Sequence, residues 1–312
     1  MSEDDKFEEN YKNFLKSCHE SAITFEGSFK NYFKKENIGK VSRKFNITKN
    51  STPGSKHDPV GNYDWVYLMQ DKIAAQLTAG IRSCPAYKEF FIKSIDEGRD
   101  SLLDVGSKFH TANLISSMFA HITYYIELSR NINLSHLNLF VVAAEAQKLP
   151  FDDGVIPFAT SLHAIEHFGL GRYGDDIDYY GDIKGIKEIS RVLMPGGFFI
   201  TSVPVTAGPS RIDYHTERVY NHKDFDDIMT SCGFEKVKEK SVLGSLRYAS
   251  KKEEKHGLLD KDGNFLDRSE AASFIIPFSD IRVEWKVDLL EKAEKLDPPV
   301  KHSAYISAWR KK

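Results

Sequence analysis

The segment HAIEHFGLGRYGDDIDYYGD, residues 163–182, concentrates groups that can do chemistry on flexible backbone. Its twenty positions hold two His, one Glu, four Asp, one Arg and four Gly. Neutral imidazole is available as a base near pH 7, and carboxylates bind metal ions or polar substrates. The composition therefore predicts acid–base chemistry or ligand binding at this segment.

Two histidines and a glutamate at the start of the segment have the spacing of metal ligands. His163, Glu166 and His167 would share one face of a helix that begins at residue 163, within reach of one divalent ion. The competing interpretation is that His163 lines a cofactor pocket while Glu166 and His167 order the loop. His163 and His167 are also the first candidates for a catalytic base, and His215 is the third.

The remainder of the segment, residues 168–182, suits the binding of a polar molecule. Its carboxylates can accept hydrogen bonds from hydroxyl groups, and its glycines would let it close over a substrate as a lid. The alternative is a rigid loop whose carboxylates cap helices and pair with an arginine. Because the loop is acidic and poor in aliphatic side chains, we expect a small polar acceptor such as a sugar, and neither a lipid nor a nucleic acid. The candidate substrate-binding residues are Arg172, Tyr173, Asp175 and Asp178.

Short apolar runs separated by longer amphipathic segments surround this loop and must position it. Such alternation is typical of βαβ units, and it predicts an α/β fold with a mostly parallel sheet covered on both faces. Ligands of such sheets bind at the carboxyl ends of the strands. The last two runs are expected to form an antiparallel pair at one edge. The runs are residues 101–105, 122–128, 138–144, 155–162, 197–205, 233–243 and 303–310.

Polar residues stand where several of these runs end. Asp104 and Gly106 lie at the turn after the first run, where a glycine lets the backbone approach a ligand and a helix N-terminus offers free N–H groups. Glu127 ends the second run, and a carboxylate there suits the two hydroxyls of a ribose. Ser161, near the end of the fourth run, is a further candidate. The sequence thus predicts a cofactor that contains ribose.

The order of these motifs over residues 100–240 resembles that of the class I S-adenosylmethionine-dependent methyltransferases. The turn DVG is followed by an acidic strand end, by EAQKLPF at 145–151 and by RVLMPGG at 191–197, as in that superfamily. The loop EHFGLGRYGD at 166–175 narrows the resemblance to an uncharacterised methyltransferase-like family with this signature.

This resemblance implies a Rossmann-like, doubly wound, mostly parallel seven-stranded sheet with an antiparallel edge strand, preceded by an N-terminal helical extension. It implies an S-adenosylmethionine-dependent methyltransferase of the EC 2.1.1 type. Asp104 and Gly106 would lie by the methionine part of the cofactor, Glu127 would hold the ribose hydroxyls, and Glu145 with Ala146 would border the adenine.

A second resemblance concerns the possible metal. Ubiquinone-biosynthesis O-methyltransferases carry a comparable E-x-x-E-H at the place of His163 to His167 and use it for a metal, with His163 here in the place of their first Glu. A divalent metal held by His163, Glu166 and His167 is therefore an open expectation.

Two stretches depart from the family patterns. Methyltransferases usually show G-x-G-x-G after the first strand, whereas GSKFH keeps Gly106 and has Lys108 and His110 where glycines usually stand. The narrower family often has NAHR after the fifth strand, and the matching stretch here is HTER at 215–218. These departures keep open a non-catalytic, cofactor-binding regulatory or interaction protein.

Two further enzyme classes compete less well. An NAD-type oxidoreductase needs G-x-G-x-x-G to seat a pyrophosphate, and GSKFHT lacks the second and third glycines. A zinc hydrolase is suggested by HAIEH, which matches H-x-x-E-H, but that motif belongs inside a long helix, and here it begins where a buried strand ends.

The whole chain sets the remaining limits. Its 312 residues are expected to form a peripheral extension over 1–60 and a methyltransferase-like domain over 61–312, with a core at 100–240, an insertion at about 245–300 and a final edge strand at about 303–309. With 43 basic and 45 acidic residues, nothing suggests a general attraction to nucleic acid. Three scattered cysteines, an acidic N-terminus and the lack of a long apolar stretch predict a cytoplasmic protein without a membrane partner.

Overall fold

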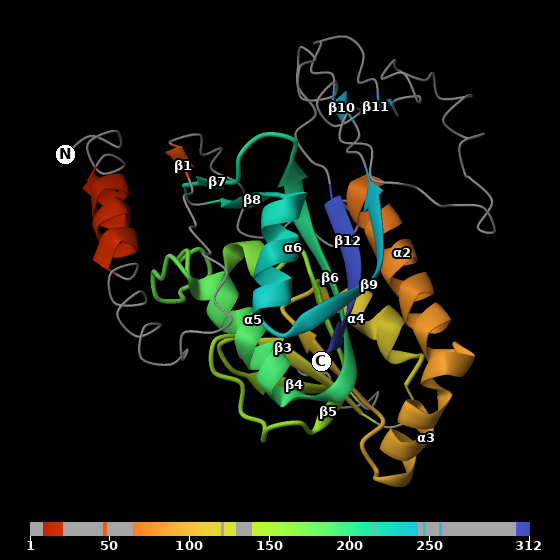
Figure 1. The fold of residues 1–312 in the computed structure, drawn as a ribbon. Coiled ribbons are helices and arrows are strands. Elements are labelled where there is room, and N and C mark those ends of the chain that lie inside the picture. Colours follow the sequence, from red (N-terminus) through yellow and green to blue (C-terminus); the bar gives the residue numbers. More distant parts are fainter. Residues whose placement is uncertain are drawn as a thin grey trace.

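The computed structural model describes most of the chain between residues 65 and 242 and shorter stretches on either side. A central sheet is covered by helices on both faces (Figure 1), which confirms the predicted α/β fold class. The described residues are 9–20, 46–48, 65–119, 122–128, 139–214, 216–242, 246–247, 256–257 and 304–312.

The core of the sheet has the strand order β4-β3-β2-β5-β6-β12-β9. Neighbouring strands from β4 to β6 run parallel, and β12 is antiparallel to both of its neighbours. This order, with one antiparallel strand next to the last, is that of the Rossmann-like methyltransferase fold. The strands are β2 (Ser101–Val105), β3 (Ile122–Glu127), β4 (Leu139–Ala143), β5 (Ile156–Leu162), β6 (Leu193–Thr206), β9 (Phe234–Val242) and β12 (Ala304–Lys311).

The final strand β12 lies one position inside the edge that the sequence predicted for it. Its residue Ile306 pairs with Ser202 of β6 on one side and with Lys240 of β9 on the other, so β9 forms the edge. The burial of residues 304–309 explains this placement, because a strand buried along its length needs neighbours on both sides. Glu235 and Lys236 of β9 are exposed charged residues, which protect an edge strand from pairing with another chain.

Alternate side chains of the strands point to opposite faces of the sheet. Leu102 and Phe198 pack with α2, α3 and α4, whereas their chain neighbours Leu103 and Phe199 pack with α5 and α6. In Figure 1 the two groups of helices flank the sheet. The helices are α2 (Trp65–Arg82), α3 (Lys88–Asp96), α4 (Phe109–Ser116), α5 (Gly181–Val192) and α6 (His222–Ser231).

The N-terminal extension is less peripheral than predicted. Residues 9–20 are helical, with Phe14 and Cys18 buried. The ring of Phe14 lies 5.0 Å from that of Tyr214, in the segment that follows β6. Farther along the chain, β1 (Asn46–Thr48) pairs in parallel with β7 (Arg211–Asp213), which forms a hairpin with β8 (Glu217–Asn221).

The predicted insertion at 245–300 lies almost wholly outside the described residues. Two short strands of it, β10 (Leu246–Arg247) and β11 (His256–Gly257), pair with each other. Among the helices that the structure describes, none is both long enough and apolar enough to cross a membrane.

Two glycines allow the loop between β5 and α5 to close on itself. Gly181 begins α5, and a Cβ atom there would lie 2.5 Å from the carbonyl oxygen of Phe168 and 2.7 Å from Cα of Gly169. Gly169 has a φ of +74°, and a Cβ there would lie 2.4 Å from the carbonyl oxygen of Asp178. The two ends of the loop therefore meet backbone to backbone, at a separation that side chains would prevent.

We expect Gly181→Ala to lower the free energy of unfolding by about 1–3 kcal/mol, because the new methyl group overlaps the backbone at residue 168. Gly80→Ala is the matched control. Gly80 is an exposed residue of α2 with nothing within 4 Å of its added Cβ, so this change should stabilise by about 0.5–1 kcal/mol. Urea unfolding of the three proteins measures both effects, and equal stability of the two variants would contradict the close approach.

Candidate active site

The carboxyl ends of β2, β3 and β4 bring two of the predicted cofactor residues to one edge of the sheet. Val105 pairs with Ile126, so Gly106 and Glu127 follow at neighbouring positions. Gly106 is exposed and has a φ of +76°, a conformation that favours glycine. Glu127 is partly exposed, and its Oε1 accepts a hydrogen bond from the backbone N–H of Leu128 at 2.9 Å.

Asp104 and Ser161 lie inside the sheet, where their side chains bond to protein groups. The Asp104 carboxylate is fully buried and accepts hydrogen bonds from the Ser107 N–H at 3.0 Å and the Thr160 hydroxyl at 2.6 Å. Burial raises the pKa of Asp104 to about 6. The buried Ser161 hydroxyl donates to the Val105 carbonyl at 2.8 Å. Both residues hold β2 to β5, so they shape the turn at Gly106 from within.

Glu145 and Ala146 follow β4 at the same edge of the sheet. Glu127 pairs with Ala143, which places Glu145 two residues beyond that pair. Glu145 is exposed, and Ala146 is partly buried against the core. The structure thus lines up Gly106, Glu127 and the segment after β4 along three adjacent strand ends.

His163 ends β5 in a backbone conformation that is unusual for its residue type. Its φ is +50°, the only positive φ of a non-glycine residue in the part of the chain that the structure describes. Its N–H contacts the Ser202 carbonyl and hydroxyl oxygens, each at 3.0 Å. The imidazole Nδ1 lies 3.0 Å from Oε1 of Glu166, and Tyr67 of α2 packs edge-on to the ring. The strained backbone aims the ring along the sheet edge.

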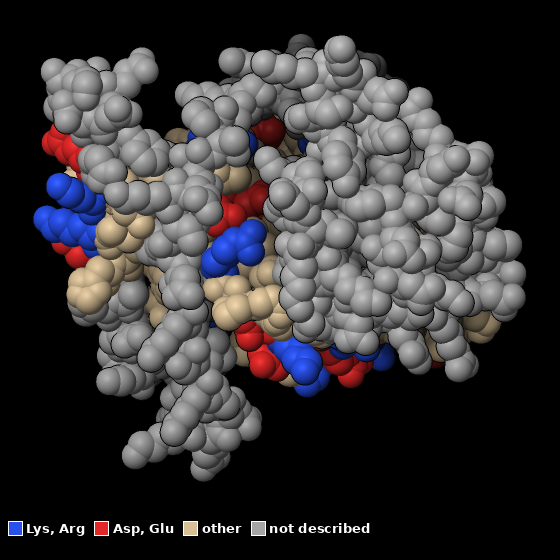
Figure 2. Space-filling model, turned by 90° about the horizontal axis from the view of Figure 1, so that it is seen from above, with Lys and Arg blue, Asp and Glu red and all other residues tan. Residues whose placement is uncertain are grey.

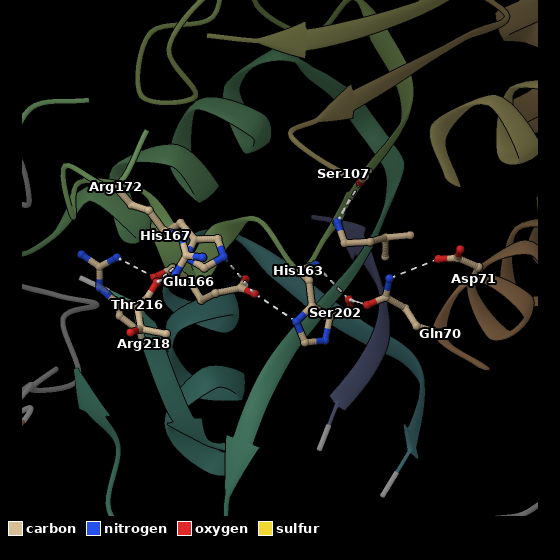
Figure 3. A network of polar contacts seen from close by, with 11 residues as sticks. Gln70, Asp71, Ser107, His163, Glu166, His167, Arg172, Ser202, Thr216 and Arg218 are labelled. Atoms are coloured by element: carbon tan, nitrogen blue, oxygen red, sulfur yellow. Dashed lines mark hydrogen bonds and ion pairs between the residues drawn. The ribbon is translucent and has the colours of Figure 1, made fainter. Parts of the chain in front are cut away.

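The predicted helix at residue 163 is absent, and a single turn of 3₁₀ helix, η2 (Ile165–His167), takes its place. The three predicted metal-binding residues still lie together, with the imidazoles of His163 and His167 on either side of Glu166 (Figure 3). Nε2 of His167 lies 3.8 Å from Oε1 of Glu166, and Nδ1 of His167 lies 2.7 Å from the carbonyl oxygen of Thr216. His163 and His167 thus flank Glu166, although no helix begins at residue 163.

Glu166 is the buried centre of this cluster. Its side chain is fully buried, its Oε1 lies 3.0 Å from Nδ1 of His163, and its Oε2 has no hydrogen-bond partner among the described residues. Burial opposes ionisation, but the imidazoles of His163 and His167 outweigh it and hold the pKa of Glu166 below its usual value. Burial also lowers the pKa of His167.

A second carboxylate, Glu217 at the start of β8, joins the cluster. Ligand atoms of Glu166, His167 and Glu217 all lie within 4.8 Å of one another. Burial, with the nearby charge of Glu166, raises the pKa of Glu217 to about 7. The three groups that converge here are thus Glu166, His167 and Glu217, and His163 lies to one side of Glu166.

Arg218 holds the loop that carries the cluster. Its guanidinium is fully buried. Nη1 donates to the carbonyl oxygen of Phe168 at 2.6 Å and to that of Glu166 at 3.3 Å. Nη2 donates to the carbonyl oxygens of Asp178 and Tyr179 at 3.1 and 3.2 Å. One side chain from β8 therefore binds both ends of the loop.

The predicted acceptor-binding residues divide into two groups. Asp175 accepts hydrogen bonds from the Gly169 and Tyr173 N–H groups, and Asp178 accepts from the Tyr180 N–H and from Lys184. These two carboxylates bond within the loop and to Lys184, and neither pairs with Arg172 in the contacts of the described residues. Arg172 donates to the Thr216 carbonyl at 3.1 Å.

Tyr173 is different, because its side chain is 44% exposed while its ring packs edge-on to His167. It is the predicted acceptor-binding residue that offers most surface to a ligand. Burial of part of the side chain raises the pKa of its phenol.

The side chains that replace the usual glycines contact helix α2. Nζ of Lys108 lies 3.8 Å from the centroid of the Tyr67 ring, and Nε2 of His110 lies 3.3 Å from a carboxylate oxygen of Asp71. From Asp71 the polar contacts continue through Gln70, which accepts a hydrogen bond from Ser202 at 2.5 Å. The altered turn thus contacts α2 through Lys108 and His110. Figure 3 shows the contacts that continue from Asp71 through Gln70 and Ser202 to His163.

Sequence reasoning missed Glu217 and Arg218, although both lie in the stretch HTER that it singled out. His215, the third predicted base, lies outside the described residues. The available signal was the pair of opposite charges in a stretch that follows a buried strand. Arg218 is fully buried. Seen from above, the surface shows other described acidic and basic side chains next to one another (Figure 2).

Comparisons with known proteins match parts of this chain. Residues 120–258 match a family model described as a Caenorhabditis protein of unknown function, DUF268. The sterol 4-C-methyltransferase strm-1 of Caenorhabditis elegans is 29% identical over 103 residues, which are 33% of this chain and 26% of that protein. The chain therefore matches about a quarter of the length of this relative.

Solved structures of similar architecture include the [4+2]-cyclase SpnF, with 19% identity, a TM-score of 0.45 and coverage of 82% of this chain and 84% of that one. A putative sarcosine dimethylglycine methyltransferase from Galdieria sulphuraria has 15% identity, a TM-score of 0.47 and coverage of 78% and 85%. The strand order identifies the Rossmann-like methyltransferase fold independently of these scores.

We expect Arg218→Lys to lower the free energy of unfolding by about 3–5 kcal/mol, because an ammonium group cannot reach the carbonyls at both ends of the loop. Arg211→Lys is the control, since this arginine is partly exposed and pairs with Asp213 two residues away, and its loss should cost less than about 1 kcal/mol. Denaturant unfolding followed by circular dichroism gives both values. A loss below 1 kcal/mol for Arg218→Lys would show that the loop does not depend on this contact.

Proposed function

We propose that this chain is an S-adenosylmethionine-dependent methyltransferase that methylates an oxygen of a small polar acceptor. The observation that carries the proposal is that exposed Gly106 and Glu127 directly follow the paired residues Val105 and Ile126, at neighbouring ends of β2 and β3. In a parallel sheet this edge is where ligands bind. An exposed glycine backbone and a carboxylate at the ends of neighbouring strands suit the amino-acid and ribose parts of the cofactor.

Four of the predicted cofactor residues would contact the cofactor directly, because Asp104 and Ser161 bond to protein groups inside the sheet. Gly106 would lie beside the methionine part, Glu127 would accept hydrogen bonds from the ribose, and Glu145 with Ala146 would border the adenine. A Cβ at Gly106 would lie 3.1 Å from Cβ of Ala164, so the end of β5 forms the near wall of this site. Asp104 acts through the turn that it holds.

His163 is the base that we assign to the acceptor. Methyl transfer is an in-line displacement that requires a positioned acceptor, and a hydroxyl must also lose its proton. The Nδ1 atom of His163 faces Glu166 at 3.0 Å, which orients the ring in the manner of a carboxylate–imidazole pair. Its Nε2 is a buried atom without a hydrogen bond among the described residues, and it would take the proton from a hydroxyl seated against it.

A polar acceptor is favoured by what lines this part of the molecule. His163, His167 and Tyr173 belong to the segment after β5, whose Ala164 and Phe168 lie next to Gly106, and each offers a hydrogen-bonding group. The matched relative is named as a sterol methyltransferase that acts at carbon, so a sterol is the second candidate acceptor.

The non-catalytic alternative rests on Lys108 and His110 in place of glycines. Their contacts with Tyr67 and Asp71 direct both side chains toward α2, while the backbone at Gly106 stays exposed. The zinc-hydrolase alternative loses its helix, because η2 is a single turn. The exposed backbone at Gly106 favours a working cofactor site over the non-catalytic alternative, and the shortness of η2 argues against a zinc hydrolase.

Glu127→Gln should weaken binding of S-adenosylhomocysteine by about 10- to 100-fold, equal to about 1.5–3 kcal/mol, because the ribose hydroxyls lose a charged acceptor. Calorimetric titration measures the change. Glu89→Gln, an exposed carboxylate of α3, is the control and should leave affinity unchanged. Binding of NAD in place of the adenosyl ligand, or equal affinity of both variants, would contradict the proposed cofactor site.

Turnover with labelled S-adenosylmethionine then tests the acceptor. Sugars, sugar nucleotides and small phenols form one arm, and sterols form the other. Methylation in the first arm is the expected result. Methylation of sterols alone would overturn the acceptor class and keep the cofactor, whereas cofactor binding without turnover on any acceptor would favour the regulatory alternative.

A further inference from the structure

Three ligand-bearing side chains from two elements converge beside the proposed cofactor site. Glu166 and His167 come from η2, and Glu217 comes from the start of β8, about fifty residues later in the chain. Their ligand atoms all lie within 4.8 Å of one another. The fold brings these groups together, since neither sequence segment contains all three.

The orientation of His167 is fixed by a backbone oxygen. A carbonyl oxygen can only accept a hydrogen bond, so the 2.7 Å contact with Thr216 places a proton on Nδ1 of His167. A ring with a single proton then presents its Nε2 lone pair toward Glu166, 3.8 Å away. Histidine metal ligands are commonly oriented in this way, with the other ring nitrogen donating to a carbonyl.

The Glu166 carboxylate is buried with one of its oxygens left without a partner among the described residues. Its side chain is completely buried, its Oε1 faces His163, and its Oε2 has no hydrogen-bond partner among the described residues. An unpartnered buried carboxylate oxygen is costly, and a second carboxylate nearby adds repulsion. A cation between Glu166 and Glu217 would offset both costs.

The geometry points to a divalent cation bound by Glu166, His167 and Glu217, a site that differs from the predicted one by having Glu217 in place of His163. Ligands about 2.0–2.2 Å from a shared ion lie roughly 3 Å apart, so small side-chain rotations close the observed spacing. One nitrogen and two carboxylate ligands suit Zn²⁺ or Mn²⁺. His163 is left to hold Glu166 from the other side.

Access to this site is from the side of Glu217 and His167, which are both partly exposed. A cation with three protein ligands keeps coordination positions for water or for an oxygen of another molecule. The competing occupant is a proton shared between the carboxylates, which would satisfy the same charges without a metal. Metal binding by the protein alone distinguishes the two, and it does not depend on the proposed methyl transfer.

The test is a calorimetric titration of the metal-free full chain, first with Mn²⁺ and, in a separate experiment, with Zn²⁺. Wild type should bind one equivalent, and Glu217→Gln should weaken the affinity at least tenfold. Asp176→Asn is the matched control, because it removes an exposed carboxylate from the same loop, and it should bind as wild type does. Equal affinity of wild type and Glu217→Gln, or no binding by wild type, would overturn the site.

A measurement on wild type alone covers the case in which Glu217→Gln does not fold. Pulsed electron paramagnetic resonance of the Mn²⁺-loaded protein should show coupling to one imidazole nitrogen, that of His167. A spectrum with no nitrogen coupling would place the ion elsewhere and contradict the proposal.

Discussion

The buried guanidinium of Arg218 is the contact on which the rest of this site depends. Taking an arginine out of water is costly unless its N–H groups find acceptors. Here the Nη atoms reach carbonyl oxygens of Glu166, Phe168, Asp178 and Tyr179, and Nε lies 3.6 Å from the buried carboxylate of Asp182. These acceptors belong to both ends of one loop, so the energy that stabilises the arginine also sets the shape of the loop. Glycines at 169 and 181 permit the same closure, because their backbones meet where side chains would collide. A loop rich in glycine is in this way held in one conformation.

The same constraint connects the loop to the edge of the sheet. Arg218 and Glu217 are consecutive residues of β8, so the strand that anchors the loop also delivers a carboxylate to the cluster. On the other side of the cluster, the His163 N–H contacts the Ser202 hydroxyl, which donates to Gln70 of α2 (Figure 3). Polar contacts therefore run from α2 across the ends of β5 and β6 to β8. The residues proposed for proton removal and metal binding lie along this path, and Gly106 lies next to it against Ala164.

Local patterns in the sequence predicted the strands of the parallel sheet and the residues at their ends. Each of the five apolar runs from 101 to 205 became a strand, and Gly106 and Glu127 lie at the strand ends where the spacing put them. Position in the chain could not show that β12 inserts between β6 and β9, because strand order follows from burial in three dimensions. Polar residues of buried strands were also ambiguous. Ser161 looked like a ligand contact, and its hydroxyl bonds instead to β2. Arg218 bonds to carbonyls 39 to 52 residues away, which no spacing rule reveals.

The central claim is that the cofactor lies along the carboxyl ends of β2 and β3, with the loop held by Arg218 beside it. A crystal structure of the protein with S-adenosylhomocysteine tests it most directly. The account predicts the ribose hydroxyls against the Glu127 carboxylate, the amino-acid part at Gly106 and the sulfur facing His163. Ligand density at any other edge of the sheet, or at this edge with the ribose away from Glu127, would contradict it.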